Sequence, residues 1–569
     1  MSATAWPGNS RVVVALLAFL LYAPAFWWGA PHATRADRTH AWGVDDETPL
    51  GSLAQLHALV APREGQNVGY AMLHPLLVGA SYAPYMGALW LSGDLRAPQP
   101  DYPYGLADPA RSLRVLSWIS HLLSVLLGVV CVVGLHEAAR CAWSAKSALI
   151  AALLAMTVFP MFYYARTGNV DIALLAFASL ALACYARCIA DGTTPRRAAW
   201  LGLWAGCALA TKESALGLLL GMALGLLLNA QRPPTTRAVQ SAGAFSRAAG
   251  YGLAVGFVTF GLGSGLFLDP GRYFAHIQEL SERVIIHAQG GVGATPGFPY
   301  TLAGHAALAR IEFSLLADCL NPLGLGLALV GVASSLRSAG RADRYLLLPA
   351  LGYAVYMFLL ARGPHLRYTL LTALLLAPFG ARALSIAESQ RSRWVSHGAM
   401  LAVTLALALA LARGASLSFE MLRDSRYQAG AWLAAHLQPG DSVGFFGASQ
   451  NLPPLPASVE SRRFGEFRGM YDLPRIDQAA ADRIANELAD AAPRFVIVIP
   501  DHTSLGLPHS GVLPAASYQA LERGELGYRR VALFQTPDPL AFAGAPTLDY
   551  PTVNPPIRVY RRIANLSPD

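Results

Sequence analysis

Three carboxylates stand side by side near the start of the chain, at Asp45, Asp46 and Glu47. Adjacent carboxylates repel one another, which tends to raise the pKa of at least one of them and favours a proton-accepting or cation-binding role. A solvated acidic loop without any chemical role is the alternative interpretation. The three residues together are a candidate general base.

A second candidate cluster is the short segment from Arg166 to Asp171, Arg-Thr-Gly-Asn-Val-Asp, which separates two apolar runs. Charged groups near the hydrocarbon region are costly unless they are paired or used by the protein. The arginine and the aspartate could therefore bind a polar substrate, or they could pair with each other.

Lysine is rare in this chain, because only Lys146 and Lys212 are lysines among 43 basic residues. Lys212 is followed by Glu213 and stands between two apolar runs. A compact ammonium on a flexible stem suits a phosphate oxygen and is not readily replaced by a planar guanidinium. The alternative is an ion pair between Lys212 and a neighbouring carboxylate.

The fourth cluster, His365-Leu-Arg367-Tyr368, begins a late apolar run. The guanidinium of Arg367 offers a planar fork that matches phosphate, and the Tyr368 hydroxyl can bind a headgroup. Basic and aromatic residues also anchor membrane helices at the interface without further function, which is the alternative here.

The composition indicates what kind of fold must position these residues. Of 569 residues, 54% are hydrophobic and 14% are charged, against about 25% charged in a typical soluble domain. Much of the surface must therefore face lipid. The net charge of +8 comes from dispersed basic residues and forms no single patch, so nucleic acid is excluded as a partner. We expect a polytopic α-helical membrane protein.

Membrane-spanning helices need about 20 mainly apolar residues. The sequence contains eleven apolar runs of about this length, of which the fifth and sixth could form two tilted helices or one broken, re-entrant pair. The runs cover residues 11–30, 113–137, 146–165, 169–190, 197–211, 213–229, 249–268, 316–336, 344–361, 366–384 and 395–413.

Arginine and lysine are concentrated in alternate loops, on the side that also holds the N-terminus. The positive-inside rule places this side in the cytoplasm, and an odd number of spans places the C-terminal region outside. The outer segments 31–112 and 269–315 then share one face with all four clusters. In the first segment, helix-breaking residues such as Pro75, Pro84 and Gly87 interrupt the apolar stretch 70–91 and favour helices that lie at the membrane interface. In the second segment, the glycine-rich stretch 289–297 is either a mobile lid or disordered.

The chain divides into a transmembrane part, residues 1–413, and an extracytoplasmic domain, residues 414–569. Short β-branched or aromatic runs predict strands, and an alanine-rich amphipathic stretch predicts a helix at 477–491. The domain carries no phosphate-binding glycine loop and no nucleophile elbow, so we assign it to support or acceptor recognition. The predicted strands of this α/β domain cover residues 441–447, 494–500, 528–536 and 557–563.

The clusters resemble motifs of the C-type (GT-C) glycosyltransferases, in particular the branch with protein O-mannosyltransferases and the lipid A aminoarabinose transferase. The resemblance covers residues 10–390, and an odd span count with an outer C-terminal domain agrees with it. The matching motifs are Asp46-Glu47, the Tyr-x-x-x-His-Pro-Leu stretch at 70–76, the Ala-Arg-Thr-Gly-x-Val-Asp turn at 165–171, Ala-Thr-Lys-Glu at 210–213 and His-x-Arg-Tyr at 365–368.

The resemblance implies transfer of a sugar from a polyprenyl-phosphate-linked donor to a protein, lipid or glycan acceptor, at the outer face of a bacterial inner membrane. It implies that Asp46, flanked by Asp45 and Glu47, activates the acceptor, and that Lys212 and Arg367 bind the donor phosphate. It also implies that no cofactor or metal is required, although the acid cluster could hold a divalent ion. The remaining motif residues expected at the substrate are Tyr70, His74, Arg166, Asp171, His365 and Tyr368.

Two other functions fit parts of the pattern. A transporter or flippase of lipid-linked sugars would use broken helices near the middle of the membrane and inverted repeats, but the ionisable residues here gather near one face and no repeat is visible. A scaffold of the same shape that has lost its activity is the second alternative, and the retention of Lys212 argues against it.

Overall fold

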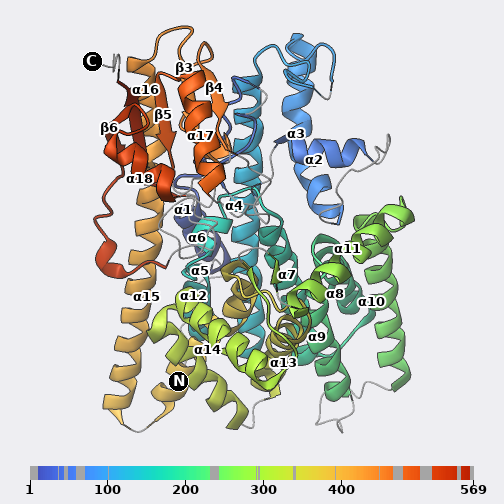
Figure 1. The fold of residues 1–569 in the computed structure, drawn as a ribbon. Coiled ribbons are helices and arrows are strands. Elements are labelled where there is room, and N and C mark those ends of the chain that lie inside the picture. The colour runs from blue at the N-terminus through green and yellow to red at the C-terminus, as the bar shows by residue number, and fades with distance from the viewer. Residues whose placement is uncertain are drawn as a thin grey trace, which may run out of the picture.

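The predicted apolar runs fold as helices (Figure 1). Each of the eleven runs contains all or part of one or two helices. The computed structural model describes residues 10–35, 38–43, 46, 49–58, 71–99, 101–230, 242–289, 291–292, 295–337, 341–390, 392–447, 449–465, 478–499, 515–546 and 553–563. The helices on these runs are α1 (Ser10–Tyr22), α4 (Pro109–Ala142), α5 (Ala145–Met156), α6 (Met161–Tyr164), α7 (Val170–Asp191), α8 (Pro195–Thr211), α9 (Ala215–Ala230), α10 (Ala242–Gly263), α12 (Leu302–Arg337), α13 (Arg341–Tyr356), the π-helical turn η2 (Met357–Ala361), α14 (Leu366–Ser389) and α15 (Arg393–Leu422).

Five helical segments in the described part of the chain are long and apolar enough to cross a membrane. They are α4, α7, α12, α14 and the segment Arg393–His436, which contains α15 and the following helix α16 (Ser425–His436). Shorter apolar helices, among them α1, α5 and α9, accompany them. The chain is an integral membrane protein, and its total of eleven crossings stays a prediction.

Side-chain caps begin several of these helices. The Asp108 side chain accepts a hydrogen bond from the backbone of Arg111 at the start of α4, and Thr194 does the same for Arg197 at the start of α8. In both helices a proline follows the cap, where its missing N–H has no helical partner to lose. The sequence thus fixes where α4 and α8 begin.

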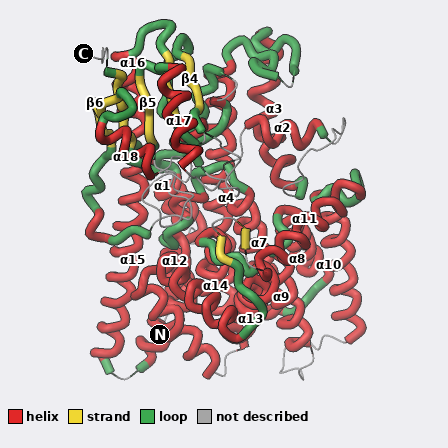
Figure 2. Tube along the Cα trace, viewed as in Figure 1, coloured by secondary structure: helices red, strands yellow, loops and turns green. Residues whose placement is uncertain are grey.

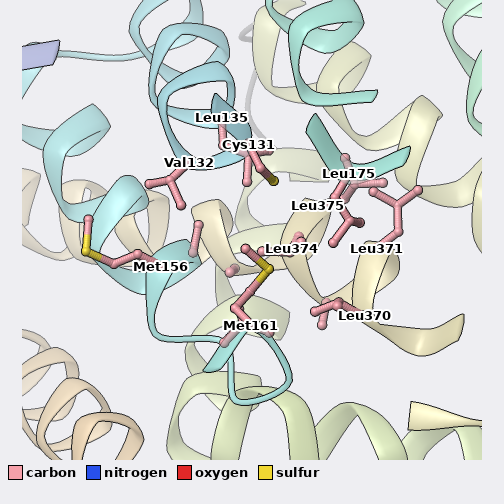
Figure 3. Close-up of a cluster of buried hydrophobic side chains, with 14 of the residues drawn as sticks. Cys131, Val132, Leu135, Met156, Met161, Leu175, Leu370, Leu371, Leu374 and Leu375 are labelled. Carbon is pink, nitrogen blue, oxygen red and sulfur yellow. The ribbon is translucent and has the colours of Figure 1, made fainter. Parts of the chain in front are cut away.

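The central core lies where α4, α5, α6, α7 and α14 meet (Figure 3). Lipid is as apolar as these side chains, so helices associate in a membrane mainly through close packing rather than through exclusion of water. The labelled core residues in Figure 3 are Cys131, Val132, Leu135, Met156, Met161, Leu175, Leu370, Leu371, Leu374 and Leu375.

Helices α8 and α10 approach each other through glycine. A Cβ atom on Gly202 would collide with the carbonyl oxygen of Gly252, and one on Gly206 would lie 2.6 Å from the carbonyl oxygen of Gly256. Two glycines four residues apart on each helix therefore let the backbones touch, as small residues commonly do between membrane helices.

The stretch 70–91, predicted as broken interfacial helices, contains one continuous helix, α3 (Leu73–Ser92), with Pro84 inside it. A proline removes one helical hydrogen bond but need not end a helix that is packed on both sides. Helix α3 packs against α2 (Pro49–His57) and α4. In Figure 1, α2 and α3 lie at the upper right, and α4 runs through the centre of the molecule.

The segment 269–315 forms helix α11 (Pro270–Gln289) and the start of α12. Between them, Gly291–Val292 (β1) and Thr295–Pro296 (β2) pair as a short antiparallel ladder. Gly290, Gly293 and Ala294 of the glycine-rich stretch lie outside the described residues.

A five-stranded sheet with the order β4-β3-β5-β7-β6 forms the C-terminal domain, at one end of an otherwise mostly helical molecule (Figure 2). All four predicted strands and the predicted helix are confirmed. The strand β4 was not predicted, because its sequence Glu-Ser-Arg-Arg is polar. The elements are β3 (Ser442–Phe445), β4 (Glu460–Arg463), α17 (Gln478–Ala491), β5 (Phe495–Val498), α18 (Ala515–Arg523), β6 (Tyr528–Phe534) and β7 (Ile557–Arg562), with short 3-10 turns at Ser449–Asn451 and Ala541–Ala543.

The sheet is mixed, since β3 pairs in parallel with β4 and β5, whereas β7 pairs antiparallel with β5 and β6. Helix α15 continues beyond residue 413, the predicted domain boundary, as far as Leu422. Asp424 then caps α16, on which the sheet rests through Ala429 and Leu433.

Replacing Gly202 by alanine should separate α8 from α10, because the added methyl group collides with a backbone atom that cannot rotate away. We expect a loss of about 1–3 kcal/mol in the free energy of unfolding, measured as a lower melting temperature in detergent. Gly250→Ala on α10 is the matched control, since a Cβ there meets nothing within 4 Å. Equal melting temperatures for the two variants would contradict the packing described.

Candidate active site

The turn between α6 and α7, residues 165–169, lies at the centre of the candidate site. Its backbone or its flanking side chains contact α1, α4, α8 and the first outer loop. Asn169 caps α7 by accepting a hydrogen bond from the backbone N–H of Asp171 at 3.0 Å. This cap places Asp171 in the first turn of α7, where the helix dipole stabilises a negative charge.

Lys212 and Asp171 form a buried ion pair. The Nζ atom of Lys212 donates to Oδ1 of Asp171 at 2.5 Å, and the two side chains are 11% and 5% exposed. Lys212 follows the last residue of α8, in the short connection to α9, so its backbone direction turns the side chain toward α7. The interpretation of Lys212 as a member of an ion pair is therefore confirmed, and the pair joins two of the four predicted clusters.

The ring of Tyr368 lies between two cations. Nζ of Lys212 is 4.6 Å from the centre of this ring, and the guanidinium carbon of Arg367 is 4.7 Å from it. Nη2 of Arg367 also donates to the Tyr368 hydroxyl at 3.1 Å. A cation over an aromatic face gains more when water is excluded, and Lys212 and Arg367 are both buried.

His365 completes this cluster from the N-terminus of α14. Its carbonyl oxygen accepts the backbone N–H groups of Tyr368 and Thr369, and its ring contacts the Tyr368 ring edge-on with 5.5 Å between centres. The structure thus brings Asp171, Lys212, His365, Arg367 and Tyr368 together, although they come from three segments of the sequence.

Asp46 reaches the same turn from the first outer loop. Its Oδ1 accepts the backbone N–H of Gly168 at 2.7 Å, and Nε2 of His121 lies 2.9 Å from Oδ2. A Cβ on Gly168 would lie 2.9 Å from both Asp46 Oδ1 and Ser120 Oγ, so only glycine permits this approach. The side chains of Asp46 and His121 are both fully buried.

The hydrogen bonds of His121 indicate a doubly protonated imidazolium. Nδ1 lies 2.6 Å from the carbonyl oxygen of Phe26, which can only accept, while Nε2 faces the Asp46 carboxylate. A neutral ring has one donor, whereas the imidazolium has two and satisfies both acceptors. A buried carboxylate paired with a cation is also far less costly than one alone.

Arg166 points away from this cluster, toward the end of α1. Its Nε and Nη2 atoms donate to the carbonyl oxygens of Tyr22 and Leu21, and Nη1 donates to Ser418 Oγ on α15 at 2.7 Å. These carbonyls end a helix and have no partner within it. Arg166 and Asp171 therefore do not pair with each other, and Arg166 holds α1 and α15 against the turn.

Glu213 binds a residue that was not predicted. Nε2 of His276 on α11 lies 2.6 Å from Oε1 of Glu213, and both groups are largely buried. On the same helix, Arg272 donates to the carbonyl oxygen of Gln55 on α2 at 3.1 Å. Helix α11 is thereby attached on one side to the Lys212 segment and on the other to α2.

The C-terminal domain holds the first outer loop in place. The guanidinium of Arg426 forms an ion pair with Asp424 at 2.7 Å and lies 4.0 Å from the centre of the Trp42 ring. Nε1 of Trp28 donates to the same carboxylate at 3.0 Å. Arg38, four residues before Trp42, donates to Ser461 Oγ of β4 at 3.0 Å. The domain thus holds the part of the loop that precedes Asp46.

His74, predicted near the substrate, is 2% exposed at the start of α3. The preceding Leu73 packs near Gly263 of α10, beside Ala210 of α8, so His74 lies close to the end of α8 that leads to Lys212. Asp45, Glu47 and Tyr70, which were also predicted at the site, lie outside the described residues.

A large apolar groove lies between α8, α9 and α10, and its lining residues on α8 end at Leu209, three residues before Lys212. It has a volume of about 580 Å³ and extends along α8 from Thr193 to Leu209. Phe260 and Leu219 line it near the Lys212 end. Its walls offer almost only aliphatic and aromatic side chains. Such a groove fits a long hydrocarbon chain whose polar end reaches Lys212.

His121 was missed by the sequence interpretation, although a signal for it existed. Ser117, Ser120, His121 and Ser124 form a polar stripe at helical spacing on one face of an otherwise apolar helix, and all four are buried. A buried polar stripe of this kind predicts a polar partner from elsewhere in the chain.

Among the described residues, no group of three or more His, Cys, Asp or Glu side chains could hold a metal ion.

Residues 113–254 match the family model described as dolichyl-phosphate-mannose-protein mannosyltransferase. The chain resembles this family. The predicted resemblance to C-type glycosyltransferases is therefore confirmed over a stretch that includes the 165–171 turn, His121 and Lys212. Asp46 and Arg367 lie outside the matched stretch. No curated protein matches the chain.

Three solved structures show a distant likeness. The ArnT protein of Cupriavidus metallidurans bound to undecaprenyl phosphate is 12% identical with a TM-score of 0.45, covering 97% of this chain and 98% of its own. The oligosaccharyltransferase of Archaeoglobus fulgidus is 12% identical with a TM-score of 0.44, covering 97% and 88%. The arabinofuranosyltransferase AftD from Mycobacteria is 16% identical with a TM-score of 0.42, covering 99% of this chain but 42% of its own. TM-scores this low say nothing about what this chain acts on.

The burial of His74 predicts a dependence of stability on pH. Burial lowers the pKa of His74 to about 4, against about 6.5 in the unfolded chain. The unfolded chain then binds this proton more tightly, so the contribution of His74 is fully present above about pH 6.5 and is lost as the pH falls toward 4.

We expect His74 to account for about 2 kcal/mol of the stability lost between pH 7 and pH 5. His74→Leu should show a smaller fall in melting temperature over this range than the wild-type protein. His436→Gln, at an exposed position in the C-terminal domain, is the control and should behave like wild type. The same fall in all three proteins would contradict the prediction.

Proposed function

We propose that this protein is a membrane glycosyltransferase that moves a sugar from a polyprenyl-phosphate-linked donor to an acceptor on the extracytoplasmic face. The observation that carries the proposal is the cluster of Lys212, Arg367 and Tyr368, which places two buried cations around one aromatic ring. Two buried cations beside one aromatic ring suit a phosphate, because its oxygens can accept hydrogen bonds from both and its negative charge can be shared between them.

In the proposed reaction, a hydroxyl of the acceptor attacks the anomeric carbon of the sugar from the face opposite the phosphate. The bond between that carbon and the phosphate oxygen breaks, its electron pair stays on the phosphate, and the configuration of the sugar is inverted. A lipid phosphate is already a good leaving group, so cations that neutralise its growing charge can replace a general acid. Lys212 and Arg367 are proposed for this role, and no metal ion is required.

Asp171 prepares Lys212 for the phosphate. The carboxylate neutralises the ammonium group while no donor is bound, which makes burial of the lysine affordable in free energy. A phosphate that enters beside Tyr368 competes with Asp171 for the same ammonium. The pair therefore provides a cation held in a defined place, and Asp171 is proposed to position it.

A carboxylate of the first outer loop is proposed to accept the proton of the acceptor hydroxyl. Asp46 is the candidate that the family resemblance favours, with Asp45 and Glu47 beside it. Asp46 accepts hydrogen bonds from Gly168 at Oδ1 and from His121 at Oδ2, so both of its carboxylate oxygens already have partners. As a base, Asp46 would therefore have to exchange one of these partners for the acceptor hydroxyl. If it keeps them, Asp46 positions the loop and a flanking carboxylate takes the proton.

The apolar groove along α8, α9 and α10 is proposed to hold the polyprenyl chain of the donor. Its lining on α8 ends at Leu209, three residues before Lys212, and its walls present hydrocarbon to hydrocarbon. The cluster then lies at the extracytoplasmic face, because the arginine-rich loops at the opposite end favour the cytoplasm. The N-terminus is accordingly proposed to be cytoplasmic and the C-terminal domain to be outside.

The two lysines of the chain provide a matched test of the phosphate role. Purified protein in lipid is given a panel of polyprenyl-phosphate sugars, and sugar transfer to candidate peptide, lipid and glycan acceptors is measured. Lys212→Ala should lose about 100-fold or more in rate, as is typical when one group that stabilises developing negative charge is removed. Lys146→Ala, which removes a half-exposed lysine paired with Glu388, should keep the wild-type rate.

Equal rates for Lys212→Ala and Lys146→Ala would refute the role of Lys212. No transfer by the wild-type protein with any donor would favour an inactive scaffold, and movement of the donor lipid across the bilayer without transfer would favour a flippase. Asp45→Asn, Asp46→Asn and Glu47→Gln in the same assay identify the proton acceptor. The variant that loses most activity while keeping the wild-type melting temperature carries the base.

A further inference from the structure

We infer that a pocket between α4, α7 and α8, at the end of the bundle opposite Asp171 and Lys212, binds the headgroup of an anionic phospholipid. The pocket has a volume of about 250 Å³. It lies where α4 and α7 end and α8 begins, and Arg187 in its lining is more than four helical turns from Asp171 along α7. This site is separate from the proposed site of glycosyl transfer.

The polar side of the pocket has an excess of positive charge. Arg187 and Arg197 line it, with side chains that are 42% and 34% exposed, together with Glu137, whose side chain is 10% exposed. Around it, four arginines (Arg11, Arg140, Arg187 and Arg197) face two carboxylates (Glu137 and Asp191) in ion pairs, which leaves a net charge of 4 − 2 = +2. An anion can therefore bind here without displacing the existing partners.

The partners of the two arginines leave room for a ligand. Nη2 of Arg187 donates to Glu137 at 2.8 Å. Nη1 of Arg197 donates to the carbonyl oxygens of Asp191 and Gly192 at 2.8 Å each. These bonds fix the direction of both guanidinium groups, and a fixed guanidinium binds a phosphate with less loss of side-chain entropy.

The other side of the pocket is apolar and aromatic. The Trp200 and Trp204 rings stack with 6.0 Å between their centres, and Phe177 stacks on Trp204 at the same distance. Val133 and Leu180 complete this wall. Tryptophan is typical of the interface between headgroups and hydrocarbon, so the aromatic wall marks the depth at which the phosphate of a lipid lies.

The combination identifies the class of ligand. A free anion would bind the arginines but make no contact with the aromatic wall. A neutral lipid would contact the aromatic wall but would not neutralise the positive charge. A glycerophospholipid with a net negative charge matches both halves, since its phosphate can reach Arg187 and Arg197 while its glycerol and upper acyl carbons lie against Trp200 and Trp204. Basic pockets between membrane helices are known to bind lipids of this kind.

The test uses the full-length protein, purified in detergent and stripped of lipid. Binding of phosphatidylglycerol and of phosphatidylcholine is measured by native mass spectrometry, and the rise in melting temperature that each lipid causes is measured in parallel. We expect phosphatidylglycerol to bind the wild-type protein preferentially, and Arg197→Gln to weaken this binding about tenfold, as expected for one charge-assisted contact. High salt should weaken it in the same direction.

Arg196→Gln is the matched control, because Arg196 is the exposed neighbour of Arg197 on the same helix and does not line the pocket. It removes the same charge and should leave phosphatidylglycerol binding unchanged. Each lipid-induced rise is compared with the same variant without lipid, so a change in basal stability does not obscure the result. Equal weakening by both variants, or equal binding of the two lipids by the wild type, would overturn the proposal.

Discussion

The hydrogen bond from the backbone of Gly168 to the carboxylate of Asp46 joins the two halves of the candidate site. The side chain of Asp46 is fully buried, and a buried carboxylate is tolerated only when it is paired with an opposite charge and hydrogen-bonded. His121 supplies the opposite charge and Gly168 supplies the N–H, which requires a residue without a side chain. Through this contact, the first outer loop is held beside the turn from which Asp171 reaches Lys212.

The surrounding elements are arranged so that this contact persists. Arg166, from the same turn, binds the end of α1 and thereby fixes where the outer loop begins. The C-terminal domain fixes the loop again through Arg426, Trp42 and Arg38. The domain thus contacts the segment that leads to Asp46, and its role in support or acceptor recognition stays a prediction. The glycine contacts hold α8 against α10, and α8 also packs against α7, from which Asp171 reaches Lys212.

Much of the fold follows from the sequence, because a run of apolar residues long enough to cross a membrane has few alternatives to a helix. The strands of the outer domain were also visible, except β4, whose polar sequence gives no strand signal. Lys212 was found through its rarity, and Asp171 and Arg367 through their positions beside apolar runs. The partners of these residues were not visible. His121 meets Asp46 across 75 residues of sequence, and Trp28 meets Asp424 across 396, and no local pattern encodes such distances.

The central claim is that Lys212 and Arg367 receive the phosphate of a lipid-linked donor at the face of Tyr368. The most direct measurement is a structure of the wild-type protein in lipid with a polyprenyl phosphate bound. The account predicts phosphate density within hydrogen-bond distance of Lys212 Nζ and of the Arg367 guanidinium, with the hydrocarbon chain in the groove along α8, α9 and α10. Phosphate bound elsewhere, with Lys212 still directed only at Asp171 and the groove empty of lipid, would contradict it.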